Sequence, residues 1–466
     1  MSTLAIVVSL AGLMYLAYRG ISVLLLAPLM AAVAIVLSGD MGHMLPLYTS
    51  TFMGALGNYM LQFFPVFLLG ALFGQLMADS GAATAISQWI MRVLGERHAM
   101  LTVVMACAVL TYGGVSLFVV AFAIFPIAKS LFQAAHLPKR LIPPTIALGS
   151  FTFTMTALPG TPSIQNAIPI PYYGTNVFAA PGLGIIGGLT MLLLGLWWLH
   201  SRAAAARAAG EGYGEHDEQR TQALDGTDAH QHRPLPLVLA LLPLLLVVAV
   251  NAALTYGVFP RVDFGFLQER FPKVDPAKQT GLWALIAALA VACAALVLLG
   301  LGRWRDLKES VNKGVLGSML PIFNTASEVG YGAVIASLAG FALIREAVLN
   351  VAPHNPLISE AVAMNVLAGI TGSSSGGLSI ALSTLGKDYL AMAAQLGISP
   401  ELLHRVAVMA AGCFDTLPHS GAIITLLSIC SLTHRQSYGN IAIMTIGAPL
   451  LSLVLVITLG TMFGSF

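Results

Sequence analysis

The chain has 466 residues, of which 57% are hydrophobic and only 9% are charged, and its formal net charge is +2. Soluble globular domains carry about 25% charged residues, so a water-soluble enzyme or binding domain of this length is excluded. A charge balance this close to zero gives no indication of nucleic-acid binding, and no nucleic-acid partner is expected.

Long apolar runs recur along the chain, and each is long enough to cross the ~30 Å hydrocarbon layer of a membrane. The sequence therefore predicts an all-α polytopic membrane protein with membrane lipid around it. The first run has no basic segment before it, and a second run follows at once, which favours a retained span over a signal peptide. About ten spans are predicted, at residues 3–18, 22–38, 54–78, 140–170, 181–200, 234–256, 280–301, 315–340, 402–432 and 439–463.

Two further apolar pieces, residues 99–132 and 357–395, are each divided by a glycine-rich stretch. These stretches read TYGGVS at 111–116 and TGSSSGG at 371–377. The two halves of each piece are short for a full span, because a span needs about 20 residues. This pattern is typical of a re-entrant helical hairpin whose tip lies at membrane depth.

The one long polar stretch, residues 201–233, is rich in glycine, alanine and charges of both signs. It is predicted to be a disordered linker between two halves, and its histidines are expected to be solvated. All cysteines fall inside apolar segments, where they are expected to pack as small hydrophobic side chains. Neither a disulfide framework, a metal site nor a cofactor is therefore predicted. The residues concerned are His216, His230, His232, Cys107, Cys293, Cys413 and Cys430.

The sequences before and after this linker resemble each other. FFPVFLLGALFG from Phe63 aligns with MLPIFNTASEVG from Met319, and GGVS at 113–116 aligns with GGLS at 376–379. Internal repeats of this kind are typical of secondary transporters.

The chain is accordingly divided into a first membrane repeat at 1–200, the linker at 201–233 and a second membrane repeat at 234–466. Five crossings in each repeat, with hairpins that return to their own side, make the second repeat inverted relative to the first. On this topology most of the 22 lysines and arginines lie on the side of the linker. The positive-inside rule therefore predicts a cytoplasmic linker and both termini outside.

Proline and glycine interrupt two of the predicted spans, 140–170 and 402–432. The interruptions read TALPGTPSIQN at 156–166 and CFDTLPHSG at 413–421. A helix broken in lipid leaves unpaired backbone groups at a cost of several kcal/mol each, so such breaks are expected to line a cavity. The two broken helices and the two hairpin tips together predict one central site.

This site offers hydroxyls, amides and helix N-termini, a combination that suits a carboxylate. No arginine or lysine occurs in the tips or the breaks, so a small hydroxylated monocarboxylate fits better than a di- or tricarboxylate. The candidate substrate-binding residues are Gly113, Gly114, Ser116, Gly160, Thr161, Ser163, Gln165, Asn166, Ser373, Ser374, Ser375, Gly376, Ser379, Thr416 and Ser420.

Asp415, His419 and Glu328 are ionisable residues inside apolar segments and are candidates for proton coupling, because charge is costly at membrane depth. Structural roles are the alternative. Asp415 could cap the resumed helix or accept hydrogen bonds from loop N–H groups, His419 could bond a carbonyl oxygen, and Glu328 could pair with Asn324 or Ser327. Sodium could also replace the proton, since hydroxyl and carbonyl oxygens at hairpin tips can coordinate it.

Three stretches resemble the gluconate permease family of proton-coupled symporters: ALPGTPSIQNAIPIPYYGT at 157–175, GLGIIGGL at 182–189 and FDTLPHSGAIITLL at 414–427. The resemblance runs through nearly the whole chain. It implies uptake of a hydroxy acid with a proton across the bacterial inner membrane. The wider ion-transporter superfamily implies a homodimer, with a scaffold domain and a mobile transport domain that moves like an elevator.

The stretches at 83–95 and 341–352 would be the arms that link the two domains. Around NTASEVGYG at 324–332 the sequence is more similar to the hydroxybutyrate permease branch than to gluconate-specific members. That similarity favours a short hydroxy acid such as 3-hydroxybutyrate over gluconate.

Two other protein classes also have sequence features in their favour. GSSSG at 372–376 fits the G-x-S-x-G pattern of a serine protease with His419 as base, but a nucleophile elbow needs a strand-to-helix turn. Re-entrant loops also build channel filters, yet channels commonly arrange identical loops around an axis between subunits. Neither class explains an internal repeat, so a transporter and not an enzyme is predicted.

Overall fold

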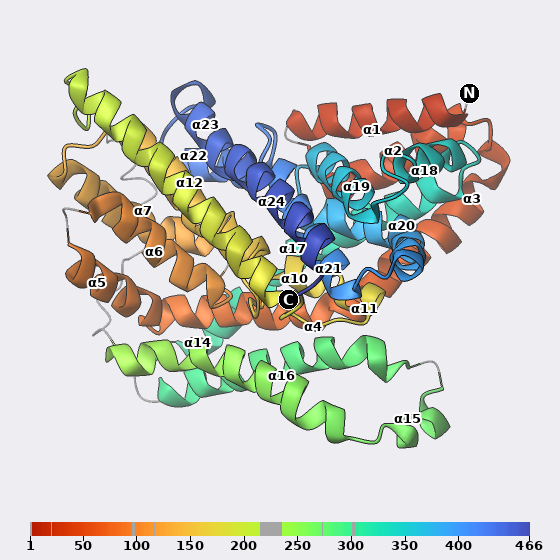
Figure 1. The fold of residues 1–466 in the computed structure, drawn as a ribbon, viewed down its shortest axis with the longest axis horizontal. Coiled ribbons are helices and arrows are strands. Elements are labelled where there is room, and N and C mark those ends of the chain that lie inside the picture. The colour runs from red at the N-terminus through yellow and green to blue at the C-terminus, as the bar shows by residue number, and fades with distance from the viewer. Residues whose placement is uncertain are drawn as a thin grey trace.

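A computed structural model describes residues 2–19, 21–95, 98–115, 117–214, 235–272, 274–300, 304 and 306–466. Every regular element in these residues is a helix, as the composition predicts (Figure 1). Within the described residues, five helical stretches are long and apolar enough to cross a membrane: Met41–Asp79, Pro181–Ala208, Leu237–Arg261, Pro276–Leu299 and His434–Phe463. The bent pair Leu307–Ser337 and Phe341–Leu349 makes a sixth if it forms one span. The polytopic membrane class is confirmed, whereas ten spans and an inverted repeat stay predictions.

The helices divide between the two halves of the chain. The first half contains α1 (Ser2–Tyr18), α2 (Val23–Leu37), α3 (Met44–Pro46), α4 (Met53–Asp79), α5 (Ala82–Leu94), α6 (Ala99–Tyr112), α7 (Leu117–Ala134), α8 (Ile142–Ser150), α9 (Phe153–Thr156), α10 (Ile164–Ala167), α11 (Ile170–Tyr173) and α12 (Pro181–Ala208). The second half contains α14 (Leu237–Ala252), α15 (Gly265–Arg270), α16 (Pro276–Leu299), α17 (Leu307–Ser337), α18 (Phe341–Leu349), α19 (Pro356–Thr371), α20 (Ser374–Leu396), α21 (Pro400–Phe414), α22 (Gly421–Ile429), α23 (His434–Ala442) and α24 (Ala448–Phe463).

Helix α4 runs between two groups of helices (Figure 1). On one side it packs against α16, which pairs with α14, and it also packs along α17 in the most extensive helix contact of the chain. On the other side of α4 in the view lie α12, α21 and α24, which contact one another. The buried centre of the protein therefore lies above α4 and α17, where the hairpins and broken helices meet.

The two predicted hairpins are present as pairs of packed helices. Helices α6 and α7 are separated at Gly113–Val115, and α19 and α20 are separated at Gly372–Ser373. Gly114 (φ +93°) and Gly372 (φ +65°) adopt the left-handed conformation that side chains rarely allow, which explains the glycine at each tip. Re-entry of either hairpin to one side of a membrane stays a prediction.

The two predicted broken helices differ in how far they are broken. In the second half, α21 ends at Phe414 and α22 resumes at Gly421, as expected. In the first half, α8 is followed by only three helices of four residues each, so no long helix resumes after the break. Pro169 explains part of the difference, because it has no N–H group to continue α10 into α11.

Helix α12 continues to Ala208, into the segment predicted as a disordered linker. The sequence SRAAAARA at 201–208 consists largely of alanine and arginine, which are strong helix formers, so the helix outlasts the apolar run. Just after it, Glu211 accepts two hydrogen bonds from Arg140, at 2.7 and 2.6 Å. The remainder of the predicted linker, from residue 215, lies outside the described residues.

Replacing Glu211 by glutamine is expected to lower the free energy of unfolding slightly, and only at pH values above the acidic range. The contact with Arg140 lowers the pKa of Glu211 below its ordinary value of 4.5. The stabilisation is therefore present above 4.5 and is lost as the pH falls through the lower value of the folded protein. Because the pair is partly exposed, we expect less than about 1 kcal/mol at pH 7. Thermal unfolding of wild type and Glu211→Gln at pH 7 and in acid would check this; an equal difference at both would contradict it.

Candidate functional site

The tip of the α19–α20 hairpin lies against the break between α21 and α22. The Ser420 hydroxyl donates to the carbonyl oxygen of Gly372 at 3.0 Å. The ring of His419 lies so close that a Cβ atom at position 372 would be 3.1 Å from it. The carboxyl group of Asp415 lies beside the hydroxyl of Ser374. Tip and break therefore form one surface, as the sequence predicts.

The break in the first half reaches the same tip. The side-chain amide of Gln165 donates to the Ser374 hydroxyl oxygen at 3.0 Å, and both groups are buried. Ser374 is thus contacted by a residue from each half of the chain, Gln165 on one side and Asp415 on the other. This convergence is the strongest support for a single central site.

Helices α4 and α17 cover the remaining side of the tip. Thr325 and Ser375 share a hydrogen bond at 3.3 Å, and the Ser379 hydroxyl donates to the phenolic oxygen of Tyr59 at 3.3 Å. The carboxylate of Glu328 lies directly against Gly376, where there is no room for a Cβ atom. Glycine is therefore required at position 376 to admit this carboxylate.

Several buried polar atoms around the tip have no hydrogen-bond partner in the described part of the chain. They are Asp415 Oδ1, His419 Nε2 and Glu328 Oε2, and Thr161 Oγ1 in the first break likewise has no partner among the described residues. Unsatisfied buried polar atoms are costly and rare in folded proteins, so a group of them indicates a place for a proton or a ligand. This part of the structure has the character of a binding site.

The structural alternatives for the three ionisable residues fare differently. Asp415 follows the end of α21, and the N-cap residue of α22 is Ser420, so Asp415 does not cap the resumed helix. Glu328 forms no hydrogen bond with Ser327, whose hydroxyl donates to the Leu24 carbonyl oxygen. His419 does contact backbone atoms of the α19 C-terminus, as its structural alternative requires.

Some predicted site residues form hydrogen bonds within the protein framework. The Ser163 hydroxyl donates to the Met155 carbonyl oxygen at 2.7 Å, and the Thr416 hydroxyl donates to Thr445 at 2.8 Å. The Asn166 amide donates to two backbone carbonyl oxygens at 3.0 and 2.8 Å. Ser373 accepts a bond from the Gly376 N–H at 3.1 Å and so caps α20. These bonds shape the breaks and the tip, and the predicted contact of these residues with substrate stays a prediction.

The tip of the first hairpin has apolar surroundings. A Cβ atom at Gly114 would lie 2.9 Å from Pro162, and one at Gly113 would collide with Leu244. Gly160 is enclosed by the rings of Phe178 and Tyr112. These glycines are explained by close packing, and their predicted contact with substrate stays a prediction. Ser116 lies outside the described residues.

Sequence reasoning missed a buried cation. Arg405 of α21 is fully buried and donates to the carbonyl oxygens of Ala179 at 3.0 and 2.8 Å and of Thr156 at 3.2 Å. Thr156 begins the first break. Although the break contains no arginine or lysine in sequence, the folded chain places the Arg405 guanidinium group against it. The folded chain brings this arginine across from the other half. The sequence does contain an indication of this buried cation, because an arginine inside the apolar run of α21 is unusual.

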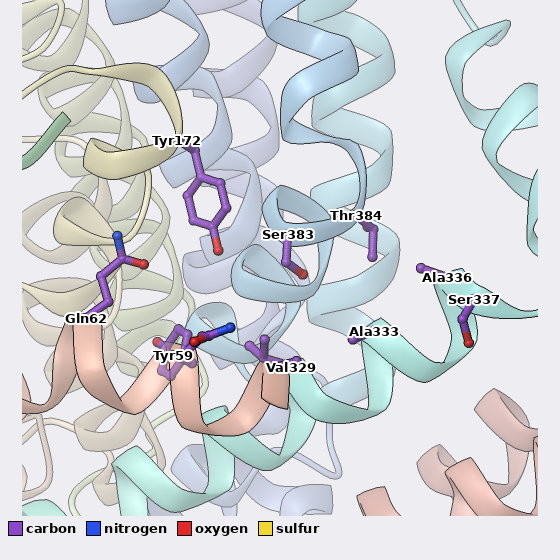
Figure 2. Close-up of a pocket in the computed structure, with 11 residues that line it drawn as sticks. Tyr59, Gln62, Tyr172, Val329, Ala333, Ala336, Ser337, Ser383 and Thr384 are labelled. Atoms are coloured by element: carbon purple, nitrogen blue, oxygen red, sulfur yellow. The ribbon is translucent and has the colours of Figure 1, made fainter. Parts of the chain in front are cut away.

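A cavity of about 460 Å³ adjoins this tip, between α4, α17 and α20 (Figure 2). The ring of Tyr172, from α11, points into it from above, and Tyr59 lies on the opposite wall (Figure 2). Tyr59 contributes to both the cavity and the α19–α20 tip, because it also accepts the hydrogen bond from Ser379. The lining residues are Ala55, Asn58, Tyr59, Gln62, Tyr172, Val329, Ala333, Ala336, Ser337, Ser383 and Thr384.

With this geometry in place, comparison with known proteins identifies the family. The family model for GntP family permeases matches residues 1–258. The uncharacterized transporter YxjC of Bacillus subtilis is 44% identical over 458 residues, which cover 96% of each chain. The chain belongs to the GntP permease family.

A more distant relative supports the same class. An uncharacterized transporter of Haemophilus influenzae is 27% identical to this GntP permease over 356 residues, 75% of this chain and 73% of its own. The predicted gluconate permease resemblance is thereby confirmed, and the comparisons indicate a multi-pass membrane transporter rather than an enzyme. Neither relative's name gives a substrate.

Proposed function

We propose that this GntP permease is a secondary active transporter that imports a small hydroxy monocarboxylate, such as 3-hydroxybutyrate or gluconate, together with a proton. The observation that carries the proposal is the convergence at Ser374. Gln165 from one half and Asp415 from the other meet the same hydroxyl, and one oxygen of Asp415 has no partner within the described residues.

The chemistry of the tip supports a hydroxylated anion. Helix α20 begins at Ser374, so its N-terminal N–H groups and partial positive charge face the point where the two halves meet. The hydroxyls of Ser374, Ser375 and Ser379 add donors and acceptors beside it. A single carboxylate can be satisfied there without a cationic side chain. Arg405 uses its N–H groups on the loops of the first break.

The two acids support coupling to a proton. Asp415 approaches the tip at Ser374 and Glu328 approaches it at Gly376, and each has a buried oxygen without a hydrogen-bond partner among the described residues. A buried carboxylate without a partner or counter-ion is costly, and binding a proton removes that cost. Proton uptake and substrate binding would then occur at the same tip.

The proposal extends to the mechanism and the assembly. Helices α6–α11 and α19–α22 would form the transport domain and move like an elevator against a scaffold containing α4, α14, α16 and α17. The arms would be α5 and α18, and α18 follows α17 at a bend of 99°. Arg345 of α18 donates to Asp388 of α20 at 2.7 Å, which links an arm to the moving part. We place a homodimer in the bacterial inner membrane, with both termini outside and the linker in the cytoplasm.

Uptake into sodium-free proteoliposomes tests the function. Radiolabelled 3-hydroxybutyrate and gluconate would be offered with and without an inward proton gradient, to wild type, to Asp415→Asn and to the exposed-loop control Asp263→Asn. We expect the gradient to drive accumulation of one acid by wild type and Asp263→Asn. Asp415→Asn should lose accumulation but keep exchange of labelled for unlabelled substrate, because exchange needs no net proton movement.

The other outcomes have definite meanings. Accumulation that appears only after sodium is added would replace the proton with sodium and return Asp415 to a structural role. Flux that never exceeds the equilibrium distribution, even with a gradient, would indicate a channel. Failure of both acids with both ions would refute the proposed substrate class.

A further inference from the structure

The cavity between α4, α17 and α20 is lined by neutral polar groups on a background of small residues (Figure 2). Ala55, Ala333 and Ala336 leave the space that larger side chains would fill. Its volume of about 460 Å³ lies within the usual range of sites for small molecules. Asn58, Ser337 and Ser383 are exposed, so the cavity opens at the surface of the protein.

Part of this polar lining has no role in holding the fold. The hydroxyls of Ser337, Ser383 and Thr384 donate to carbonyl oxygens of their own helices. In contrast, the side chains of Asn58 and Gln62 show no hydrogen bond within the described residues. They lie on successive turns of α4 and both face the cavity. Two amides that face a cavity without a hydrogen-bond partner among the described residues are suited to a polar ligand.

The cavity adjoins the tip at Tyr59, but its far end lies too far from Ser374 for one solute to contact both. Ser383 follows Ser374 by nine residues on α20, a distance of about 13 Å along the helix axis. A hydroxy acid of four to six carbons is about 4–7 Å long when extended, so it cannot reach both places. The hydrogen bond from Ser379 to Tyr59 lies between them.

We propose that this cavity is a second binding site for the transported hydroxy acid, and that the Ser379–Tyr59 contact separates it from the tip. The amide N–H groups of Asn58 and Gln62 and the phenolic groups of Tyr59 and Tyr172 donate to the carboxylate and hydroxyl oxygens of the solute. No residue that lines the cavity is charged, so the anion is held only by neutral hydrogen bonds and is readily released. The identity of the solute rests on the proposed function.

A cysteine at position 333 tests the site directly. Ala333 lines the cavity, whereas Ala326, on the same helix, is fully buried away from it. The native cysteines are all buried and set a low background for a water-soluble thiol reagent. We expect Ala333→Cys to react and Ala326→Cys not to react. Potassium 3-hydroxybutyrate or gluconate at ten times its dissociation constant should slow the reaction about ten-fold, whereas butyrate should not.

The same measurement in variants with an altered tip separates the two sites. Gly376→Ala is expected to disable the tip, whereas Asp415→Asn removes only its proton-binding group, and protection of the thiol introduced by Ala333→Cys should persist in each. Loss of protection in Gly376→Ala would show that the cavity has no binding site of its own. Wild-type uptake with no protection of the introduced thiol would overturn this inference alone. Protection without uptake would leave the cavity site standing and refute the proposed transport.

Discussion

Replacing Arg405 by alanine is expected to lower the free energy of unfolding by about 3 kcal/mol or more. The guanidinium group is fully buried and holds the carbonyl oxygens of Thr156, Val177 and Ala179 on the loops around the first break. Its loss removes the side-chain donor from the carbonyl oxygens of Thr156 and Ala179, whereas Val177 keeps its bonds from Gly160 and Asn166, and it opens a cavity between the two halves. Unfolding in mixed detergent micelles would measure the change.

Two variants make that result specific. Arg435→Ala removes an exposed arginine from α23 and should change stability by no more than about 0.5 kcal/mol. Arg405→Lys keeps the charge but not the planar set of five donors, so an intermediate loss is expected. A full rescue by lysine would show that charge alone matters at this position. An Arg405→Ala protein as stable as wild type would refute the stabilising role of these hydrogen bonds.

Replacing Gly376 by alanine is expected to abolish transport while the protein still folds. A Cβ atom at this position would occupy the space of the Glu328 carboxylate, which must then leave the tip. We expect a loss of about 1–3 kcal/mol in stability, the usual cost of overpacking a close contact. Proteoliposome uptake and micellar unfolding would measure the two effects.

A double mutant identifies the colliding group. In a Glu328→Ala background the added methyl group has room, so the stability cost of Gly376→Ala should largely disappear. Gly421→Ala is the matched control, because a Cβ atom there meets nothing within 4 Å. If Gly376→Ala still lowers stability in the Glu328→Ala background, the strain lies in the backbone and not in the contact with Glu328.

Local chemistry made the hairpin tips and the breaks predictable. Gly114 and Gly372 take the left-handed conformation that the glycine-rich stretches indicate, and the break before Gly421 follows from Pro418. Asp415 and Glu328 stand out in sequence because ionisable residues are rare in apolar segments. These features depend on a few neighbouring residues and need no knowledge of the tertiary structure.

Other features depend on contacts between distant segments, which the sequence does not predict. The hydrogen bond from Gln165 to Ser374 joins residues 209 positions apart. The place of Arg405 beside Thr156 and the cavity between α4 and α20 likewise arise only when helices pack. Helix α12 extends past the predicted start of the linker for a different reason, because alanine and arginine favour a helix even where hydrophobicity falls.

The predicted internal repeat bears on how the packing of α4 against α17 arose. These helices carry the aligned stretches from Phe63 and Met319, so on the predicted repeat each packs against its counterpart. Two copies of one shorter chain make such a contact across a two-fold axis. A duplication that joined the copies would have freed each to diverge, and Leu72 in one half now aligns with Glu328 in the other. Two identical copies would have carried two such acids or none. This chain instead has an acid at the position in one half and an apolar residue at the aligned position in the other.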